Sequence, residues 1–416
     1  MSSRGLRRSS AAAGIAVALL AGGPAVRAAE PETVGVVRTL ENPTPHWFWL
    51  SDIILHRTAL FDADAGSLRG VITAGTPGVG FIVLPQISAD KREIYIAESY
   101  FSRGVRGERT DVVTVYDGST LQPLHEIGIP PKRAEYFPGN ASSTLSDDGQ
   151  LLAVFNLTPM TSLSIVDVKA RRFVAEVPTP GCSLVYAAGP RRFLMLCANG
   201  EGLLVTVDGA GATPTTRTAR FFDPQQDPIT EKAVRRGNDW FFVSFEGMVH
   251  PVDVAGETLR FGEPWSLFDD ADRQAKWRIG GGQLLAIHGP TGRLYGLMHQ
   301  GGPDTHKEPG TEVWVYDLAG RKRVQRIPLL SPLMSFVAQQ AALDPATTKG
   351  RFGRWFLDTV MPHLGVERIL VTQDDTPILI ASASMPPTVT IHDAMSGAVL
   401  REVSEPGLGG GLLVPH

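Results

Sequence analysis

The sequence contains few of the residues on which self-contained chemistry depends. The 416-residue chain has two cysteines, and its ten histidines are scattered. It has no HExxH, no CxxC pair, no GxSxG nucleophile elbow and no glycine-rich phosphate loop. His299, Asp304 and His306 are close in "HQGGPDTH", but a loop does not fix their spacing, so a solvated loop is favoured over a metal site. We therefore predict no catalytic residue and no metal ion on this chain.

An excess of basic charge and long apolar runs are also missing. The formal net charge is −4 at pH 7, and residues 1–28 carry four arginines and no acidic residue, which leaves −8 on the remainder. Such an acidic chain argues against a nucleic-acid partner. No segment after residue 28 is long and apolar enough to cross a bilayer, so we expect no membrane partner either.

Residues 1–28 differ in composition from the rest. Arg4, Arg7 and Arg8 precede an apolar run over residues 11–20, and a small-residue end follows at Ala28. This is the layout of a cleaved secretory signal, with a non-cleaved anchor as the alternative. We predict a signal peptide over 1–28, export of the protein and a single domain over 29–416.

The two cysteines, Cys182 and Cys197, flank a strand pattern, a Gly-Pro turn and a second strand pattern. In an exported chain two cysteines more often pair than remain free, and a disulfide across such a hairpin is geometrically reasonable. A metal site at this pair lacks any further cysteine ligand. We predict a disulfide between them.

Long helical patterns are nearly absent, whereas glycine (44) and proline (31) are plentiful, which favours β structure. Seven apolar strand patterns end in aspartate, and most of them lie between a preceding strand pair and one following strand. Dividing the 388 residues after position 28 among seven units gives about 55 residues each, close to the length of a propeller blade. The aspartates are Asp62, Asp117, Asp167, Asp208, Asp253, Asp317 and Asp393.

Seven such units predict an all-β fold, a seven-bladed β-propeller of four-stranded antiparallel blades. Stacking around an axis gives each small sheet a neighbour on both faces. Closure requires the two ends, residues 45–52 and 409–416, to meet in one blade. Two β-sandwiches in tandem are the alternative, but they do not explain seven equal units. Residues 331–367 interrupt the pattern, and apolar residues at helical spacing there predict a short helical insert.

A basic loop separates two strand patterns in "AESYFSRGVRGERTDVVTVYD", residues 97–117. Arg103, Arg106 and Arg109 lie there, after Phe101 and close to two acidic residues. A loop between two strands of a blade must project at one end of the propeller. It is either a self-paired solvated loop or a docking surface for an acidic partner. We take Phe101 and the three arginines as candidate partner contacts.

Several stretches together resemble the heavy subunit of quinoprotein amine dehydrogenases. They are the segment over 97–117, "IPPKR" (129–133), "TSLSIVDV" (161–168), the cysteine hairpin, "GEPWSLFDD" (262–270), "GRLYGLMH" (292–299) and "THKEPGTEVWVYD" (305–317). The likeness covers most of the chain after residue 28. "PPKR", "PWSL" and "THK" make it closer to the aromatic amine dehydrogenase branch than to methylamine dehydrogenase.

The resemblance implies a periplasmic complex of two heavy and two cysteine-rich small subunits. It implies a propeller heavy subunit with one disulfide, and a tryptophan tryptophylquinone cofactor and catalytic base on the small subunit. The implied reaction converts a primary amine to aldehyde and ammonia, with electrons passed to a blue-copper protein. The cofactor supplies the electron sink, and this chain supplies walls, orientation and exclusion of water. The lack of catalytic motifs fits this role.

The sequence departs from the family at the stretch before Asp62, which is shorter than in the methylamine branch, and at the insert. We expect Trp355 and Phe356 of the insert to pack at the small subunit or the substrate entrance; a self-contained surface hairpin is the alternative. For the chain as a whole, a stand-alone periplasmic binding propeller and a propeller hydrolase with a central metal remain as other hypotheses.

Overall fold

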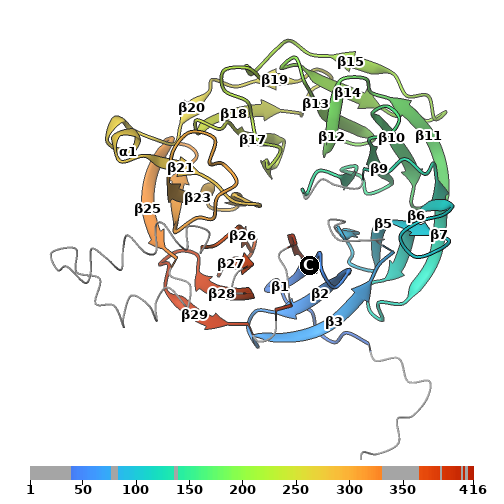
Figure 1. The fold of residues 1–416 in the computed structure, drawn as a ribbon, viewed down its shortest axis with the longest axis horizontal. Helices are drawn as coiled ribbons and strands as arrows, with labels where there is room; N and C mark the ends of the chain where they lie inside the picture. The colour runs from blue at the N-terminus through green and yellow to red at the C-terminus, as the bar shows by residue number, and fades with distance from the viewer. Residues whose placement is uncertain are drawn as a thin grey trace, which may run out of the picture. The chain divides into compact units, whose positions relative to one another are not determined.

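The computed structural model of this protein describes residues 39–75, 83–134, 139–329, 365–384, 387–403, 406–407 and 411–416. The chain divides into two units, Met1–Arg38 and Thr39–His416, and the described residues belong to the second. They form seven antiparallel sheets arranged around a central axis (Figure 1). The predicted seven-bladed β-propeller is therefore confirmed. No helix in these ranges is long and apolar enough to cross a membrane.

In blades 2, 3, 4 and 7 neighbouring strands of the sheet follow one another in the chain, whereas the first blade combines strands from both ends of the chain. Blades 1 to 4 comprise β30 (Leu413–Pro415), β1 (Trp47–Asp52), β2 (Arg57–Asp62) and β3 (Ser67–Thr73); β4 (Gln86–Ile87), β5 (Glu93–Phe101), β6 (Arg109–Asp117) and β7 (Pro123–Ile129); β8 (Ser143–Leu145), β9 (Leu151–Asn156), β10 (Ser162–Asp167) and β11 (Arg172–Pro178); and β12 (Cys182–Ala187), β13 (Arg192–Cys197), β14 (Gly202–Thr206) and β15 (Thr215–Arg217).

The remaining blades carry small additions to the same plan. Blade 5 has an extra strand that pairs β18, and in blade 6 two short strands pair β23. Blades 5 to 7 comprise β16 (Val234–Arg236), β17 (Asp239–Val243), β18 (Met248–Asp253), β19 (Arg260–Phe261) and β20 (Trp265–Ser266); β21 (Trp277–Ile279), β22 (Leu285–His288), β23 (Arg293–Gln300), β24 (Glu312–Asp317) and β25 (Lys322–Pro328); and β26 (Arg368–Val371), β27 (Ile378–Ser384), β28 (Pro387–Asp393) and β29 (Val399–Glu402).

The repeated aspartates have a structural cause, because six of the seven end the third strand of a blade. There the carboxylate accepts hydrogen bonds from the backbone of the turn that follows. Oδ1 of Asp117 accepts from the amides of Ser119 (2.9 Å) and Thr120 (2.7 Å), and Asp393 does the same in blade 7. Aspartate thus fixes the turn into the outermost strand, which is why the pattern could be found in the sequence.

Blade 1 is built from both ends of the chain, as predicted from closure. β30 pairs antiparallel with β1, and the indole Nε1 of Trp49 donates to His416 (3.1 Å). The side chain of Gln283 holds the same strand from outside the blade. Its Nε2 donates to the carbonyl of Leu413, and its Oε1 accepts from the amide of Leu413, both at 3.0 Å.

Side-chain contacts of a histidine also connect blade 1 to blade 7. His46, just before β1, contacts Asp64 through Nδ1 (2.8 Å) and Asp374 through Nε2 (3.1 Å). Burial lowers the pKa of His46, but the hydrogen bonds and charges of the two carboxylates outweigh burial and raise the pKa above its ordinary value.

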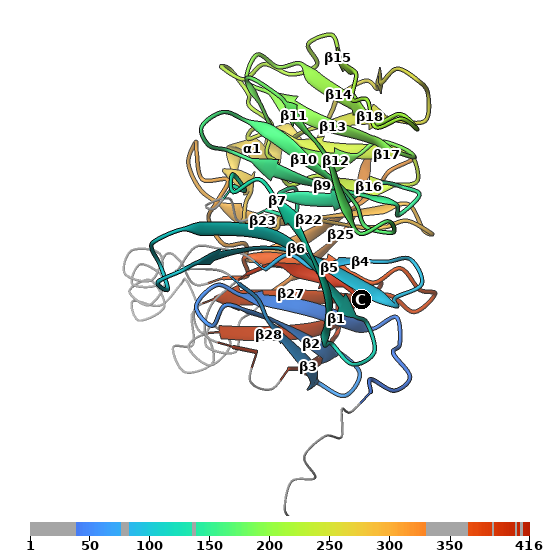
Figure 2. The ribbon, with the colours of Figure 1, turned by 90° about the vertical axis from the view of Figure 1, so that its right-hand side faces the viewer.

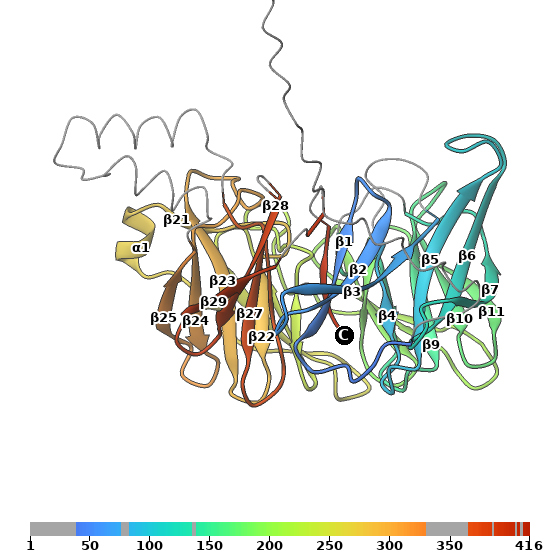
Figure 3. The same cartoon turned by 90° about the horizontal axis from the view of Figure 1, so that it is seen from below.

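Strand direction alternates within each blade, so the connections fall at two ends of the ring. We call one end the loop face: it carries the connections between second and third strands, which are residues 53–56, 102–108, 157–161, 198–201, 244–247 and 301–311 in blades 1 to 6. The outermost strand of each blade ends at this face and the first strand of the next blade begins there, as the end of β25 and the start of β26 do. Among the described connections, 102–108 projects far beyond its sheet (Figures 2 and 3).

The predicted helical insert at 331–367 lies almost wholly outside the described residues, as do Trp355 and Phe356. In the described ranges the single α-helix is α1 (Asp270–Gln274), which Asp269 caps through a capping box.

Candidate functional site on the loop face

The hairpin between β5 and β6 presents the basic residues singled out in the sequence. Its ends are joined by a backbone hydrogen bond from Ser102 to Glu108 (3.0 Å), and its tip by one from Arg103 to Arg106 (3.0 Å). Gly104 and Gly107 adopt φ of 74° and 106°, a region that favours glycine. The turn is therefore specified by local sequence, and it holds the tip away from the blade.

The arginines of this hairpin fall into two groups. Arg109 makes a bidentate pair with the buried Asp111, at 2.7 and 2.8 Å, and also donates to the carbonyl of Arg133 (2.8 Å). Arg103 and Arg106 are exposed and form no ion pair with any residue in the described ranges. Arg109 thus has the self-paired role, and the two tip arginines remain available to a partner. Phe101 is half-buried at the base of the hairpin.

The predicted disulfide is present. Cys182 and Cys197 are directly opposite in the pairing of β12 with β13, and their sulfur atoms are bonded at 2.04 Å. The bond closes a segment with a sequence separation of 15. Both cysteines line the wall of a cavity that opens on the loop face, so the disulfide fixes the edge of that cavity.

A cavity of 820 Å³ occupies the centre of the ring at the loop face, and we call it the funnel. A second cavity of 530 Å³ lies along the inner strands toward the opposite end. Lys232, Gly282 and Leu412 line both, so they mark the junction between the two. The other funnel residues come from the ends of β12, β13 and β26, from connections in blades 3 to 6, and from the residues just before β30. They include Thr161, Leu184, Phe222, Ile229, Glu231, Phe245, His306, Lys307 and Arg368.

Positive charge is concentrated in the funnel. The side chain of Lys232 is 8% exposed, and its ammonium lies 3.7 Å from Glu231. Burial lowers the pKa of Lys232, Glu231 opposes that change, and the charges of Lys307 and Arg368 reinforce it. Arg368 is itself paired with Glu367 at 2.9 Å. Lys232 and Arg368 escaped the sequence analysis because neither lies in a recognised motif, and only the ring brings them together.

The two histidines of the 299–306 segment do not converge. Nε2 of His299 contacts the hydroxyl of Thr305 (2.9 Å), and burial lowers the pKa of this histidine to about 4. His306 instead stacks on Phe245 with 3.6 Å between ring centroids. In the parts of the chain that the structure describes, no group of three or more His, Cys, Asp or Glu could hold a metal ion.

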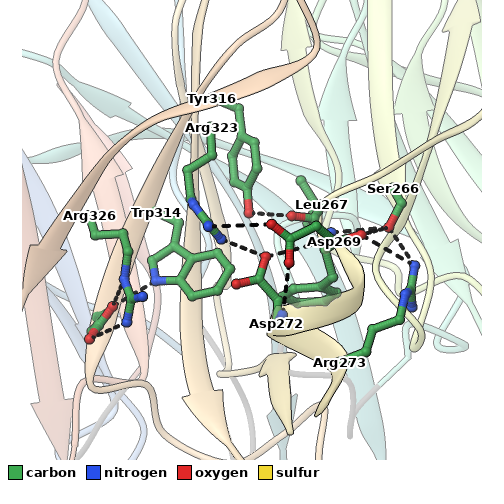
Figure 4. Close-up of polar contacts among 11 residues, drawn as sticks. Ser266, Leu267, Asp269, Asp272, Arg273, Trp314, Tyr316, Arg323 and Arg326 are labelled. Atoms are coloured by element: carbon green, nitrogen blue, oxygen red, sulfur yellow. Dashed lines mark hydrogen bonds and ion pairs between the residues drawn. The ribbon is translucent and has the colours of Figure 1, made fainter. Parts of the chain in front are cut away.

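A second polar cluster lies on blade 6, where α1 packs beside the strands (Figure 4). Arg323 donates to Asp272 (2.7 Å) and lies 4.1 Å from the ring centroid of Trp314. Arg326 makes a bidentate pair with Glu312 at 2.7 and 2.9 Å and also faces that indole. The charges here are paired with one another, so the cluster stabilises the "GEPWSLFDD" and "EVWVYD" segments and leaves no group poised for chemistry.

Comparison with known proteins agrees with the resemblance of the sequence motifs. The model of the methylamine dehydrogenase heavy chain (MADH) family matches residues 53–347. The chain belongs to this family. The heavy chain from Methylophilus methylotrophus is 26% identical over 348 residues, which cover 83% of this chain and 76% of that protein. The heavy chain from Paracoccus versutus is 26% identical over 361 residues, covering 86% and 75%.

Solved structures support the fold of this heavy-chain family member. A functionally unknown protein from Desulfotomaculum acetoxidans DSM 771 superposes with a TM-score of 0.56 at 12% identity, covering 89% of this chain and 98% of that one. A dihydro-heme d1 dehydrogenase gives a TM-score of 0.53 at 14% identity, covering 91% and 77%. Family and fold together support a propeller subunit of an amine dehydrogenase. The relatives do not distinguish the aromatic branch from the methylamine branch.

Proposed function

We propose that this chain is the heavy subunit of a periplasmic quinoprotein amine dehydrogenase that oxidises a primary amine to aldehyde and ammonia. The observation that carries the proposal is the family match over residues 53–347. The seven-bladed propeller is consistent with it, because this is the fold that the resemblance implies for a heavy subunit. The export signal expected over residues 1–28 supports the location.

The quinone cofactor belongs, in this proposal, to a separate cysteine-rich small subunit. This placement follows from the family resemblance, which implies that the cysteine-rich chain carries the cofactor, and the family match over residues 53–347 supports it. The quinone would supply the electron sink, and a blue-copper protein would accept the electrons. The role left to this chain is to orient the small subunit and to exclude water from the reacting amine.

The loop face is the surface that we assign to the small subunit, in a complex of two heavy and two small chains. Two features support this assignment. The exposed Arg103 and Arg106 at the projecting tip are suited to carboxylates of a partner. The connection that carries Trp355 and Phe356 begins and ends at the same face, after β25 and before β26. Both can therefore meet one partner.

We further propose that the substrate is closer to that of the aromatic amine dehydrogenase branch. The support is the set of short motifs "PPKR", "PWSL" and "THK". In the structure, "THK" includes His306 and Lys307, which line the funnel. The motif is thus placed where the two branches could differ in the surface that they present at the loop face.

Co-expression with a cysteine-rich small subunit encoded beside this chain tests the proposal directly. We expect a tagged heavy chain to copurify with the small chain, to show quinone absorbance, and to reduce a dye when a primary amine is added. Phenylethylamine and methylamine, compared at equal concentration, separate the two branches. A colourless chain that purifies alone would refute the proposal and favour a stand-alone binding propeller, for which the funnel is the supporting observation.

The docking surface has its own test. Reversing both tip charges (Arg103→Glu with Arg106→Glu) should weaken assembly about tenfold or more at low salt and less at high salt. The matched control is Arg321→Glu, which changes an exposed arginine at the turn between β24 and β25, away from the loop face. Unchanged assembly in the double variant, with the propeller still folded, would show that the tip is only a solvated surface.

A further inference from the structure

Lys232 is an under-satisfied cation at a buried position. Its side chain is 8% exposed, and the contact of its ammonium with Glu231 at 3.7 Å is too long for a strong hydrogen bond. No other hydrogen bond from this ammonium to a described residue is present. A buried ammonium normally satisfies its donors with several acceptors, because loss of hydration is costly. Lys232 lines both cavities, so its ammonium is within reach of a ligand bound there.

Glu231 offsets part of the charge of Lys232, and two further cations add positive charge around it. Lys307 and Arg368 line the same funnel, and both disfavour the charged form of Lys232. Arg368 keeps Glu367 as its own partner, at 2.9 Å, so that carboxylate is not free to neutralise the lysine. A negative group entering the funnel would therefore relieve repulsion among these cations as well as accept hydrogen bonds.

Apolar side chains also line the funnel, together with the charged groups around Lys232. These apolar side chains include Phe222, Phe245, Ile229 and Leu184, and His306 stacks flat against Phe245. A cavity of 820 Å³ with apolar walls and a few convergent polar groups has the size and character of a small-molecule site. The combination of ring stacking surfaces and a cation at the base suits an amphipathic anion.

We propose that the funnel binds a small organic carboxylate, with its charged group at Lys232 and its apolar body against the Phe245–His306 stack. Lys307 and Arg368 contribute long-range attraction, and Glu231 opposes binding. The funnel opens on the loop face that we assign to the small subunit, so this inference concerns the heavy chain by itself and does not depend on the amine dehydrogenase assignment. A cationic amine would be repelled from it, so the funnel is unsuited as the entry path of an alkylammonium substrate.

Isothermal titration of the full chain with phenylacetate tests this inference, in a buffer without carboxylate or phosphate. The neutral analogue 2-phenylethanol has the same ring and a similar length, so the comparison isolates the charge. We expect phenylacetate to bind at least about tenfold more tightly than the alcohol, and Lys232→Met to remove that advantage. The control Lys322→Met removes an exposed lysine on β25 and should leave the affinity within about twofold.

A second variant keeps the test decisive if Lys232→Met fails to fold. Glu231→Gln removes the opposing carboxylate, and because this side chain is partly exposed we expect phenylacetate to bind about threefold more tightly. Equal binding of phenylacetate and 2-phenylethanol by the unmodified chain would overturn the inference. So would unchanged phenylacetate affinity in a folded Lys232→Met chain, or unchanged or weaker affinity in Glu231→Gln.

Discussion

The side chain of Gln283 should be a major determinant of ring closure. It is 7% exposed, and its amide pairs with both backbone groups of Leu413 at 3.0 Å. The backbone of Gln283 is bonded to blade 7, because its backbone N–H donates to the carbonyl of Glu367 (3.0 Å) and its backbone carbonyl accepts from the N–H of Ile369 (3.0 Å). One residue therefore links the entrance of blade 7 to the strand that completes blade 1.

Gln283→Met keeps the length of the side chain but removes both hydrogen bonds to Leu413. Each buried backbone group left without a partner costs about 1–3 kcal/mol, so the free energy of unfolding should fall by about 2–6 kcal/mol. With an unfolding entropy of about 2.1 cal/mol/K per residue over the ordered domain, that loss lowers Tm by roughly 3–8 °C. Besides lowering the stability of the whole domain, the substitution should loosen β30 itself, because β30 is short and pairs only with β1 in blade 1.

Thermal unfolding combined with hydrogen-exchange mass spectrometry measures both effects. We expect faster exchange in peptides covering residues 411–416, whereas peptides from β9 and β10 should be unchanged under native conditions. Gln226→Met, at an exposed position in the connection before β16, is the matched control. A Tm within about 1 °C of the unmodified protein, with unchanged exchange at 411–416, would mean that the glutamine bridge adds no net stability.

Three other predictions concern pH, the disulfide and the insert. The raised pKa of His46 implies that its contacts stabilise the fold fully below the ordinary histidine pKa, and that this stabilisation is lost as pH rises through the folded-state pKa. His46→Gln should therefore lower the free energy of unfolding more at about pH 5.5 than at about pH 9. Equal losses in urea titrations at the two pH values would contradict this. Replacing Cys182 and Cys197 with alanine should cost about 3 kcal/mol by the chain-entropy estimate, and peptide mapping of the unmodified protein without reductant should recover the linked pair rather than two free thiols. Deleting residues 333–364 should alter amine preference or assembly of the complex, and unchanged kinetics in an intact complex would remove the proposed role of that segment.

The elements predictable from sequence were those encoded by short, local patterns. The aspartate at the end of the third strand recurs because it caps the next turn with its own carboxylate, as Asp117 does. The Cys182–Cys197 bond was predictable because a single hairpin places the two residues opposite one another. The pairing of Arg109 with Asp111 was foreseen as one of two alternatives, since the partner is two residues away.

The features that could not be predicted depend on contacts between distant segments. Gln283 reaches a strand 130 residues further along the chain, and nothing in its neighbourhood in the sequence indicates that strand. Lys232 looks like an ordinary lysine in a loop until the connections of several blades enclose it. Burial of this kind is a property of the closed ring, so composition and periodicity carry no trace of it.

The double origin of blade 1 also has a consequence for how this molecule is made. His416 lies 367 residues beyond Trp49, to which it hydrogen-bonds, and β30 must reach β1 across the same interval. Until those last residues emerge during synthesis, β1 presents an unpaired inner edge, and such an edge invites mispairing with other chains. A contact of this sequence separation also forms late, because closing a long loop is entropically costly. We therefore expect protection of the nascent chain to matter most for the exposed edge of β1.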